Sequence, residues 1–180
     1  MFVAFMVAVI VAQFLPVERT DDKEIIRLTG MILGAAFIWL FGILDDRRNF
    51  GPLPQYIAQL IAAAIAVAFL IFIEQFNNPL TGERTPEWPY VVTVTISLFW
   101  LGLMMNTVNW LDGLDGLAAG VCAVASAIMF LHAAFRLNQT SVSLLPLALL
   151  GATLGFLPYN LHPARLFMGS NGALFVGFKV

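Results

Sequence analysis

The sequence predicts an all-α fold, a polytopic bundle of helices that spans a membrane, and three observations support this prediction. First, 60% of the 180 residues are hydrophobic and 11% are charged, whereas a typical soluble domain has about 25% charged residues. Second, about 20 helical residues cross the ~30 Å hydrocarbon core of a bilayer, and six apolar runs are this long or nearly so. Third, the charged residues (Lys, Arg, Asp and Glu) lie outside these runs. The runs cover residues 1–15, 28–44, 55–73, 90–111, 116–135 and 141–161.

The first run, and a seventh one near the end of the sequence, are shorter than a full span. The run 1–15 starts at Met1 without preceding basic residues, and no small-residue cleavage site follows it. We therefore interpret it as a shortened helix and not as a signal peptide. A seventh run begins at Gly172 and includes Lys179. We expect one transmembrane domain over residues 1–180, with six spans and the start of a seventh, incomplete at its C-terminus and also at its N-terminus.

The second run contains three glycines whose expected role is packing. Gly30, Gly34 and Gly42 lie on the run 28–44. Small residues at these spacings let two helices approach closely in a membrane.

Six alternating helices place every second connecting segment on the same side of the membrane. One side, called here the motif face, receives the segments 45–54, 106–115 and 162–171. All five glutamates fall on the opposite face together with Asp21 and Asp22, whereas the motif face has only aspartates: Asp45, Asp46, Asp112 and Asp115. Short carboxylates at helix ends suit metal and phosphate binding, and long glutamates on loops suit solvation. This separation indicates a functional site on the motif face.

The densest group of polar side chains lies between two apolar runs. Asn106, Asn109, Asp112 and Asp115 follow one another at intervals of three residues. A polar turn is the simpler interpretation, because Asp-Gly is common in turns. However, a carboxylate at the membrane centre costs roughly 2.5–3.5 kcal/mol, and this segment has two Asp-Gly pairs next to apolar runs. We therefore favour a functional site.

A pair of aspartates ends the second run. At a helix C-terminus, Asp45 and Asp46 face the negative end of the helix dipole, which is electrostatically unfavourable. One interpretation is that Arg47 and Arg48 neutralise them on an exposed loop. The other, which we favour, is that the pair holds Mg²⁺ or accepts a proton from a phosphate nucleophile.

The last segment of the motif face combines an amide, a guanidinium and a glycine-rich turn. Asn160 lies where prolines favour a non-helical passage, and Arg165 is a suitable phosphate partner. The Gly-Ser-Asn-Gly sequence at residues 169–172 resembles an anion-binding turn at a helix N-terminus. The alternative is that Ser170 or Asn171 is an ordinary N-cap.

Together these residues indicate a reaction class. Carboxylates and amides, without a nucleophilic cysteine or a serine triad, are typical of Mg²⁺-assisted phosphoryl transfer. Such a site at a membrane surface implies that one substrate is a lipid. The small net charge of −2 argues against a nucleic-acid partner.

Three segments match the motifs of a known family. They read LFGILDDRRN, NTVNWLDGLDGLAAG and FLPYNLHPARLFMGSNGALFVGF. In this order and spacing they resemble the polyprenyl-phosphate N-acetylhexosamine-1-phosphate transferases of glycosyltransferase family 4. That family includes the phospho-N-acetylmuramoyl-pentapeptide transferase of peptidoglycan synthesis and the UDP-GlcNAc:undecaprenyl-phosphate GlcNAc-1-phosphate transferases. The resemblance implies a larger helix bundle, of which this chain would hold the middle.

The resemblance also implies an activity. The protein would transfer N-acetylhexosamine-1-phosphate, expected to be GlcNAc-1-phosphate, from a UDP-sugar to undecaprenyl or another polyprenyl phosphate, and would release UMP. This would be the first membrane step of cell-wall or surface-polysaccharide synthesis. The cofactor would be Mg²⁺, with Mn²⁺ as an alternative, and the partners a UDP-N-acetylhexosamine and polyprenyl phosphate. The protein would lie in the inner (plasma) membrane with its active face in the cytoplasm. The sequence leaves open whether it forms a homodimer.

Residue roles follow from the resemblance in the same way. Asp45 and Asp46 would face the lipid phosphate, one of them as the catalytic base. Asn109 would contact the metal or the pyrophosphate. The residues expected to bind substrate are Asn106, Asp112, Asp115, Asn160 and Arg165.

Two positions depart from the family pattern. Ser170 stands where the family has a Mg²⁺-binding aspartate, and Gln55 stands where it often has lysine. A neutral hydroxyl cannot replace an ionised carboxylate as a ligand of a hard cation, so a catalytically impaired remnant is one alternative function. The other is an ion-coupled transporter, which would need its carboxylates near the bilayer midplane on broken helices.

The distribution of basic residues opposes a cytoplasmic motif face. Basic residues normally gather on the cytoplasmic side of a membrane. The motif face has three of them and the opposite face five. They are Arg47, Arg48 and Arg165 against Arg19, Lys23, Arg27, Arg84 and Arg136.

Overall fold

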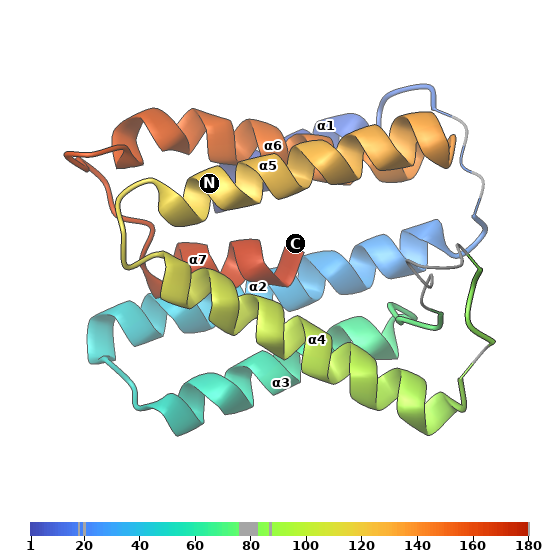
Figure 1. The fold of residues 1–180 in the computed structure, drawn as a ribbon, viewed down its shortest axis with the longest axis horizontal. Helices are drawn as coiled ribbons and strands as arrows, with labels where there is room; N and C mark the ends of the chain where they lie inside the picture. Colours follow the sequence, from blue (N-terminus) through green and yellow to red (C-terminus); the bar gives the residue numbers. More distant parts are fainter. Residues whose placement is uncertain (18, 20, 76–82, 87, 180) are drawn as a thin grey trace.

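The structure, a computed structural model, describes residues 1–17, 19, 21–75, 83–86 and 88–179. Within these residues the chain is all-α, with seven α-helices (Figure 1). The helices are α1 (Phe2–Ala12), α2 (Glu24–Arg48), α3 (Pro52–Ala68), α4 (Tyr90–Leu111), α5 (Leu117–Leu131), α6 (Thr140–Asn160) and α7 (Gly169–Lys179). A short π-helical segment, η1 (His132–Arg136), continues α5.

Four helical segments of the described chain are long and apolar enough to cross a membrane. They are α2, α4, α5 with η1, and α6, while α1 and α3 are apolar but shorter. The predicted all-α architecture is therefore confirmed, with four candidate membrane spans in the described residues in place of the predicted six. The predicted run 90–111 coincides with α4 at both ends.

Helix α3 is shorter than the apolar run that predicted it, because it ends at Ala68 and not near residue 73. Leu70 adopts a left-handed backbone conformation with φ of 64°, and the N–H of Ile71 donates to the carbonyl of Ala66 (3.1 Å). A left-handed residue with this hydrogen bond closes a helix C-terminus. Apolar side chains continue past the helix, so hydropathy alone did not show where the helix stops.

Helix α2 is longer than its predicted run. Asp45 to Arg48 form its last turn, and not a loop as the sequence suggested. The helix ends at Asn49, which is left-handed (φ 49°) and donates its N–H to the carbonyl of Asp45 (2.7 Å). The two aspartates are therefore held by helical backbone.

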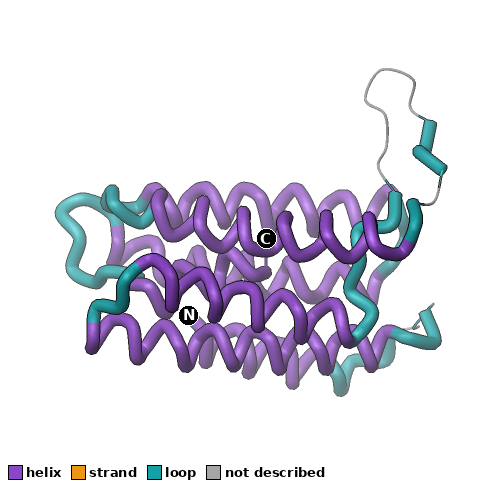
Figure 2. The backbone as a smooth tube through the Cα atoms, turned by 90° about the horizontal axis from the view of Figure 1, so that it is seen from below, coloured by secondary structure: helices purple, strands orange, loops and turns teal. Residues whose placement is uncertain are grey.

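Helix α7 occupies the interior of the bundle. The long helices run along one common direction, as Figures 1 and 2 show from two sides, and α7 packs mainly against α2 and α4. All residues of α7 from Gly172 to Phe178 are buried. Helices α5 and α6 form a second closely packed pair, and α1 lies against α6.

Glycines on α2 permit this close packing, as the sequence predicted. A Cβ atom at Gly34 would lie 2.5 Å from the Phe178 ring of α7. A Cβ atom at Gly42 would overlap the Cα of Asn171 and lie 2.7 Å from its backbone nitrogen. Any side chain at Gly42 would therefore push the start of α7 away from the end of α2.

Candidate active site

The three predicted motif segments meet at one end of the bundle, which we call the motif end (left in Figure 1). The C-terminal ends of α2, α4 and α6 lie there, with the N-terminal ends of α3, α5 and α7. Glu24 and Glu74 lie at the opposite end of these helices, and Glu18 and Glu87 fall outside the described residues. Glu24 and Glu74 therefore lie away from the motif end, as predicted, and so does Asp21.

Asp46 holds the start of α7. Its Oδ1 accepts a hydrogen bond from the N–H of Ser170 (2.8 Å), and its Oδ2 accepts one from the N–H of Asn171 (3.3 Å). A carboxylate at this position satisfies backbone donors of the first helical turn and interacts favourably with the positive end of the helix dipole. Asp46 and Ser170, 124 residues apart in sequence, are thus neighbours.

This contact changes the interpretation of residues 169–172. Ser170 and Asn171 lie inside the first turn of α7, so neither is the N-cap that the sequence offered as an alternative. The turn does bind an anion, but that anion is the protein's own Asp46. Gly169 is left-handed (φ 67°), and a Cβ atom there would lie 2.9 Å from Asp46 Oδ2. Glycine at this position therefore allows the carboxylate to approach.

Asp45 has different surroundings, although it is adjacent in sequence. It is buried, with 3% of its surface exposed. Its Oδ1 accepts the N–H of Phe50 (3.1 Å) and its Oδ2 accepts Gln55 Nε2 (2.8 Å). These bonds join the end of α2 to the start of α3. Asp45 and Asp46 therefore do not face one common ligand.

The alternative in which arginines neutralise this pair finds no support. Within the described residues, neither Arg47 nor Arg48 forms an ion pair with Asp45 or Asp46. Both arginines are exposed at the end of α2.

Asp112, the C-cap residue of α4, lies beside Gly169, the first residue of α7, and so does Asp46. Burial raises the pKa of Asp112 from 3.8 to about 6, a hydrogen bond from the Gly169 backbone opposes this rise, and the charge of Asp46 adds to it. Asp46 and Asp112 thus approach the first residue of α7 from two helices and repel each other there. They form the carboxylate pair of the site.

Asp112→Asn is expected to change how stability depends on pH. The folded protein holds the Asp112 proton up to about pH 6, whereas the unfolded chain releases it near 3.8. Raising the pH from about 4 to about 7 therefore lowers the free energy of unfolding of the native protein through this group. Asparagine cannot ionise, so thermal denaturation in detergent without divalent cations should show the variant gaining stability relative to the native protein. A constant difference over this pH interval would contradict the raised pKa.

Asp115 and Asn160 connect the α4–α5 turn to the α6–α7 loop. Asp115 Oδ2 accepts the N–H of Ala164 (3.2 Å) and lies 3.0 Å from His162 Nδ1. The buried Asn160 accepts the N–H of Gly116 with its Oδ1 (3.1 Å) and donates from Nδ2 to the carbonyl of Leu166 (3.0 Å). Both side chains shape the loops at this end, and a direct contact with substrate stays a prediction for each.

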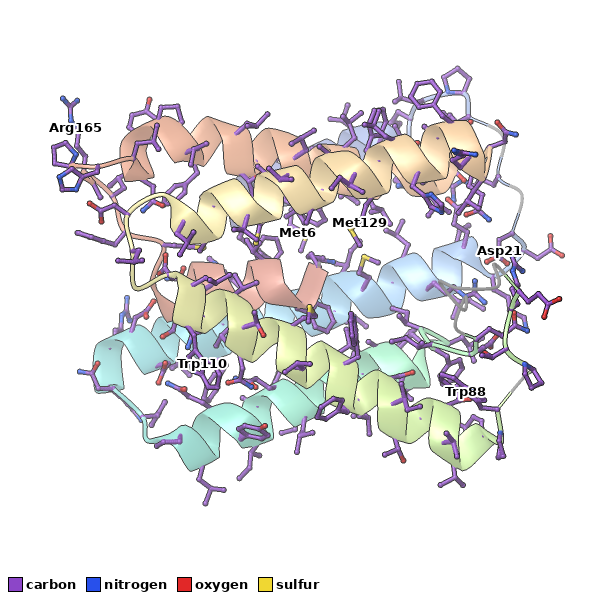
Figure 3. All side chains as sticks on the ribbon, viewed as in Figure 1. Met6, Asp21, Trp88, Trp110, Met129 and Arg165 are labelled. Carbon is purple, nitrogen blue, oxygen red and sulfur yellow. The ribbon has the colours of Figure 1, made fainter. Side chains whose placement is uncertain are left out.

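The other predicted residues lie at different depths. Asn109 is half-buried one turn before Asp112 on α4. Asn106 lies a further turn into the helix and pairs with Gln59 of α3, a residue that the sequence interpretation missed. Arg165 is exposed at the tip of the α6–α7 loop and points outward, whereas Asp21 and Trp88 mark the opposite end (Figure 3). The structure does not bring Arg165 to the Asp46–Asp112 pair.

Within the described ranges, no three His, Cys, Asp or Glu side chains are grouped as metal ligands. Ser170 contacts Asp46 through its backbone N–H, and Asn109 lies one turn before Asp112 on α4. These are the positions that the sequence predicted for the metal.

An apolar groove of about 360 Å³ runs between α3 and α4. Tyr56 and Leu60 line it from α3, and Phe99 and Leu103 line it from α4. Asn106 and Trp110, the lining residues of α4 nearest its C-terminus, extend the groove toward the motif end.

Comparison with known proteins identifies the family. The profile of glycosyl transferase family 4 matches residues 28–180. A probable undecaprenyl-phosphate N-acetylglucosaminyl 1-phosphate transferase of Bacillus subtilis (strain 168) is 34% identical over 157 residues, which are 86% of this chain and 42% of the relative. A phospho-N-acetylmuramoyl-pentapeptide-transferase of Staphylococcus saprophyticus is 33% identical over 186 residues, which are 96% of this chain and 57% of the relative.

The name of a third relative includes another polyprenyl phosphate. The decaprenyl-phosphate N-acetylglucosaminephosphotransferase of Mycolicibacterium smegmatis is 27% identical over 187 residues, which are 100% of this chain and 46% of the relative. The chain spans about half the length of the curated relatives it matches. The resemblance carried by the three motifs is thereby confirmed, and the chain belongs to glycosyl transferase family 4, the family of polyprenyl-phosphate N-acetylhexosamine-1-phosphate transferases.

Proposed function

We propose that this protein transfers N-acetylhexosamine-1-phosphate, in our assignment GlcNAc-1-phosphate, from a UDP-sugar to undecaprenyl or another polyprenyl phosphate. The observation that carries the proposal is the meeting of Asp46 and Asp112 at the first residue of α7. The apolar groove between α3 and α4 extends toward the same end of the bundle. The names of the relatives support the choice of substrates, because each includes a sugar-phosphate group and two include a polyprenyl phosphate.

In the proposed reaction a phosphate oxygen of the lipid attacks the phosphorus that carries the sugar. A new phosphorus–oxygen bond forms, and the bond between this phosphorus and the bridging oxygen of UDP breaks. The bridging oxygen leaves with UMP, so one pyrophosphate replaces another. Positioning and charge stabilisation dominate reactions of this type.

Asp46 is the better candidate for the base that removes a proton from the lipid phosphate. Its carboxylate is exposed at the motif end, and each oxygen accepts one hydrogen bond in the structure, which leaves lone pairs available. Asp45 is buried and joins α2 to α3. We assign to Asp45 the role of holding the turn on which Asp46 depends.

The residues present fit a divalent cation. Asp46 and Asp112 are two carboxylates whose mutual repulsion contributes to the raised pKa of Asp112, and a cation between them would relieve that repulsion. Asp46, Asp112, Asn109 and the Ser170 hydroxyl are the groups that would hold it. Bound Mg²⁺ or Mn²⁺ would neutralise charge on the pyrophosphate.

The remaining roles follow from position. Asp115 and Asn160 would fix the two loops against which the UDP-sugar binds, and Arg165 would reach a phosphate only if its loop turned inward. The groove between α3 and α4 would receive the first part of the polyprenyl chain. We place the protein in the inner (plasma) membrane with the motif end in the cytoplasm, as the family resemblance implies and against the count of basic residues.

Ion-coupled transport is the weaker alternative. It would place carboxylates near the bilayer midplane on interrupted helices. In this structure Asp45 and Asp46 lie in the last turn of α2 and Asp112 caps α4, so the acidic groups lie at helix ends.

The Ser170→Asp variant tests the catalytic proposal. In the full-length protein with polyprenyl phosphate and UDP-GlcNAc, we expect the variant to release UMP at a Mg²⁺ concentration about tenfold or more below that needed by the native protein. The reason is that a carboxylate is a stronger ligand for a hard cation than a hydroxyl, and outer-shell groups alone change metal affinity by about 10–100-fold.

The matched control is Ser170→Asn, which has nearly the shape of aspartate without its charge and should bring no such gain. If the native protein and Ser170→Asp both fail to release UMP while an active relative does so in the same assay, the proposed function is wrong.

A further inference from the structure

A buried amide and a half-buried amide pair with each other between α3 and α4. Gln59 of α3 has 1% of its surface exposed, and it donates from Nε2 to Asn106 Oδ1 (3.3 Å). In return, Asn106 donates from Nδ2 to Gln59 Oε1 (2.5 Å). Polar groups inside a membrane bundle are costly unless they are hydrogen-bonded, so this pair is a specific contact between the two helices.

A third hydrogen bond fixes which way the Asn106 amide points. Asn106 Nδ2 also donates to the backbone carbonyl of Gly102, one turn earlier on α4 (2.9 Å). A carbonyl can only accept, so the NH₂ group of Asn106, and not its oxygen, must face Gly102. The orientation of the Gln59 amide follows, because its oxygen must face the remaining N–H of Asn106.

This orientation determines what Asn106 can offer to a ligand. An amide has two N–H donors and one oxygen with two lone pairs. Both donors of Asn106 are used, one by Gln59 and one by Gly102. One lone pair of Oδ1 is used by Gln59. What remains is a single acceptor on a residue that lines the groove between α3 and α4.

We propose that Gln59 is a positioning residue that acts through Asn106. The reciprocal amide pair holds Asn106 as a hydrogen-bond acceptor at the motif-end part of the groove, one helical turn before Asn109 and two before Asp112. Asn106 thereby faces a donor on the substrate side, such as a hydroxyl or a protonated phosphate oxygen, and does not donate to a phosphate. This inference rests on the proposed transferase function and adds the role of Gln59 to it.

The test compares Gln59→Met with the native full-length protein, in whichever background, native or Ser170→Asp, gives the higher turnover. Methionine has nearly the shape of glutamine and suits a membrane interior, but it cannot pair with Asn106. We expect kcat/KM for polyprenyl phosphate to fall on the order of tenfold, the lower end of the cost of losing a supporting hydrogen bond. KM for the UDP-sugar should change little, because only the groove is affected.

Three further variants separate positioning from simple stabilisation. Ser97→Ala removes a buried hydroxyl of α4 that accepts the N–H of Ile73 (2.9 Å), far from the motif end, and it should lower the melting temperature without changing kcat/KM. Gln59→Glu, which can still accept from Asn106, should retain more activity than Gln59→Met. In an Asn106→Ala background, Gln59→Met should cost little more, because residues that act through one another are not additive.

The outcomes are distinct. Turnover that Gln59→Met leaves unchanged, or that it lowers equally with and without Asn106, overturns this inference and leaves the proposed function standing. Absence of turnover in every background, with an active relative as positive control, overturns both.

Discussion

Replacement of Gly42 by alanine is expected to remove most of the activity and to lower the free energy of unfolding by about 1–3 kcal/mol, the usual cost of overpacking. The added methyl group would overlap the Cα of Asn171 and lie 2.7 Å from its backbone nitrogen. Because these are backbone atoms, no side-chain rotation relieves the contact, and the start of α7 must move. A displacement of about 1 Å in an active site can cost about 10²-fold in rate.

The site is sensitive to this movement because Asp46 binds the N–H groups of Ser170 and Asn171. The measurements are the melting temperature in detergent and the rate of UMP release. Gly155→Ala on α6 is the matched control, because no neighbouring heavy atom lies within 4 Å of the position its Cβ would occupy. Alanine is a better helix former than glycine by about 0.5–1 kcal/mol, so the control should be neutral or stabilising. Equal melting temperatures for the two variants would show that α2 and α7 are not packed as described.

Asp46→Asn is expected to affect mainly the rate of UMP release, and Asp45→Asn mainly the free energy of unfolding, although the two residues are adjacent. Asp46→Asn should reduce UMP release by about a hundredfold or more, which is the lower range of general-base contributions. It should lower the free energy of unfolding by less than Asp45→Asn does, because Asp46 is exposed and water can satisfy the backbone N–H of Ser170 or Asn171 that loses its acceptor.

Asp45→Asn should instead lower the free energy of unfolding by about 1–3 kcal/mol, the cost of an unsatisfied buried polar group. Asparagine replaces one of the two accepting oxygens by an NH₂ group, which would then face a donor, either the N–H of Phe50 or Gln55 Nε2. The protein that remains folded should keep more activity than Asp46→Asn. A variant pair in which Asp45→Asn is stable but inactive, and Asp46→Asn is active, would reverse our assignment of the base.

The sequence was sufficient to predict the all-α architecture and the meeting of three polar segments at one end of the bundle. Apolar runs identify helices because hydrocarbon excludes charged groups, and α4 begins and ends where its run does. The alternation of helices then brings the three polar segments to one end of the bundle, which the structure confirms. The glycines of α2 were correctly interpreted as packing residues, because only small side chains allow such an approach.

Individual side chains were harder to predict, because their surroundings depend on helices that are distant in sequence. Nothing in the sequence distinguishes the surroundings of Asp45 from those of Asp46. They differ because the start of α7 packs against Asp46 only. The turn at residues 169–172 was correctly seen as an anion-binding shape, but its occupant comes from 124 residues away. Gln59 left a visible signal, a polar residue inside an apolar run, and its partner could be found only from the crossing of α3 and α4.

Because Asp46 accepts hydrogen bonds from two backbone N–H groups of α7, the packing of this helix depends on the charge of one side chain. The carboxylate that we assign to proton transfer is also the anchor of the innermost helix. Any event that withdraws its negative charge weakens two backbone hydrogen bonds at once and is transmitted along α7 into the centre of the molecule. The proposed proton transfer and the packing of the innermost helix are therefore linked through a single side chain.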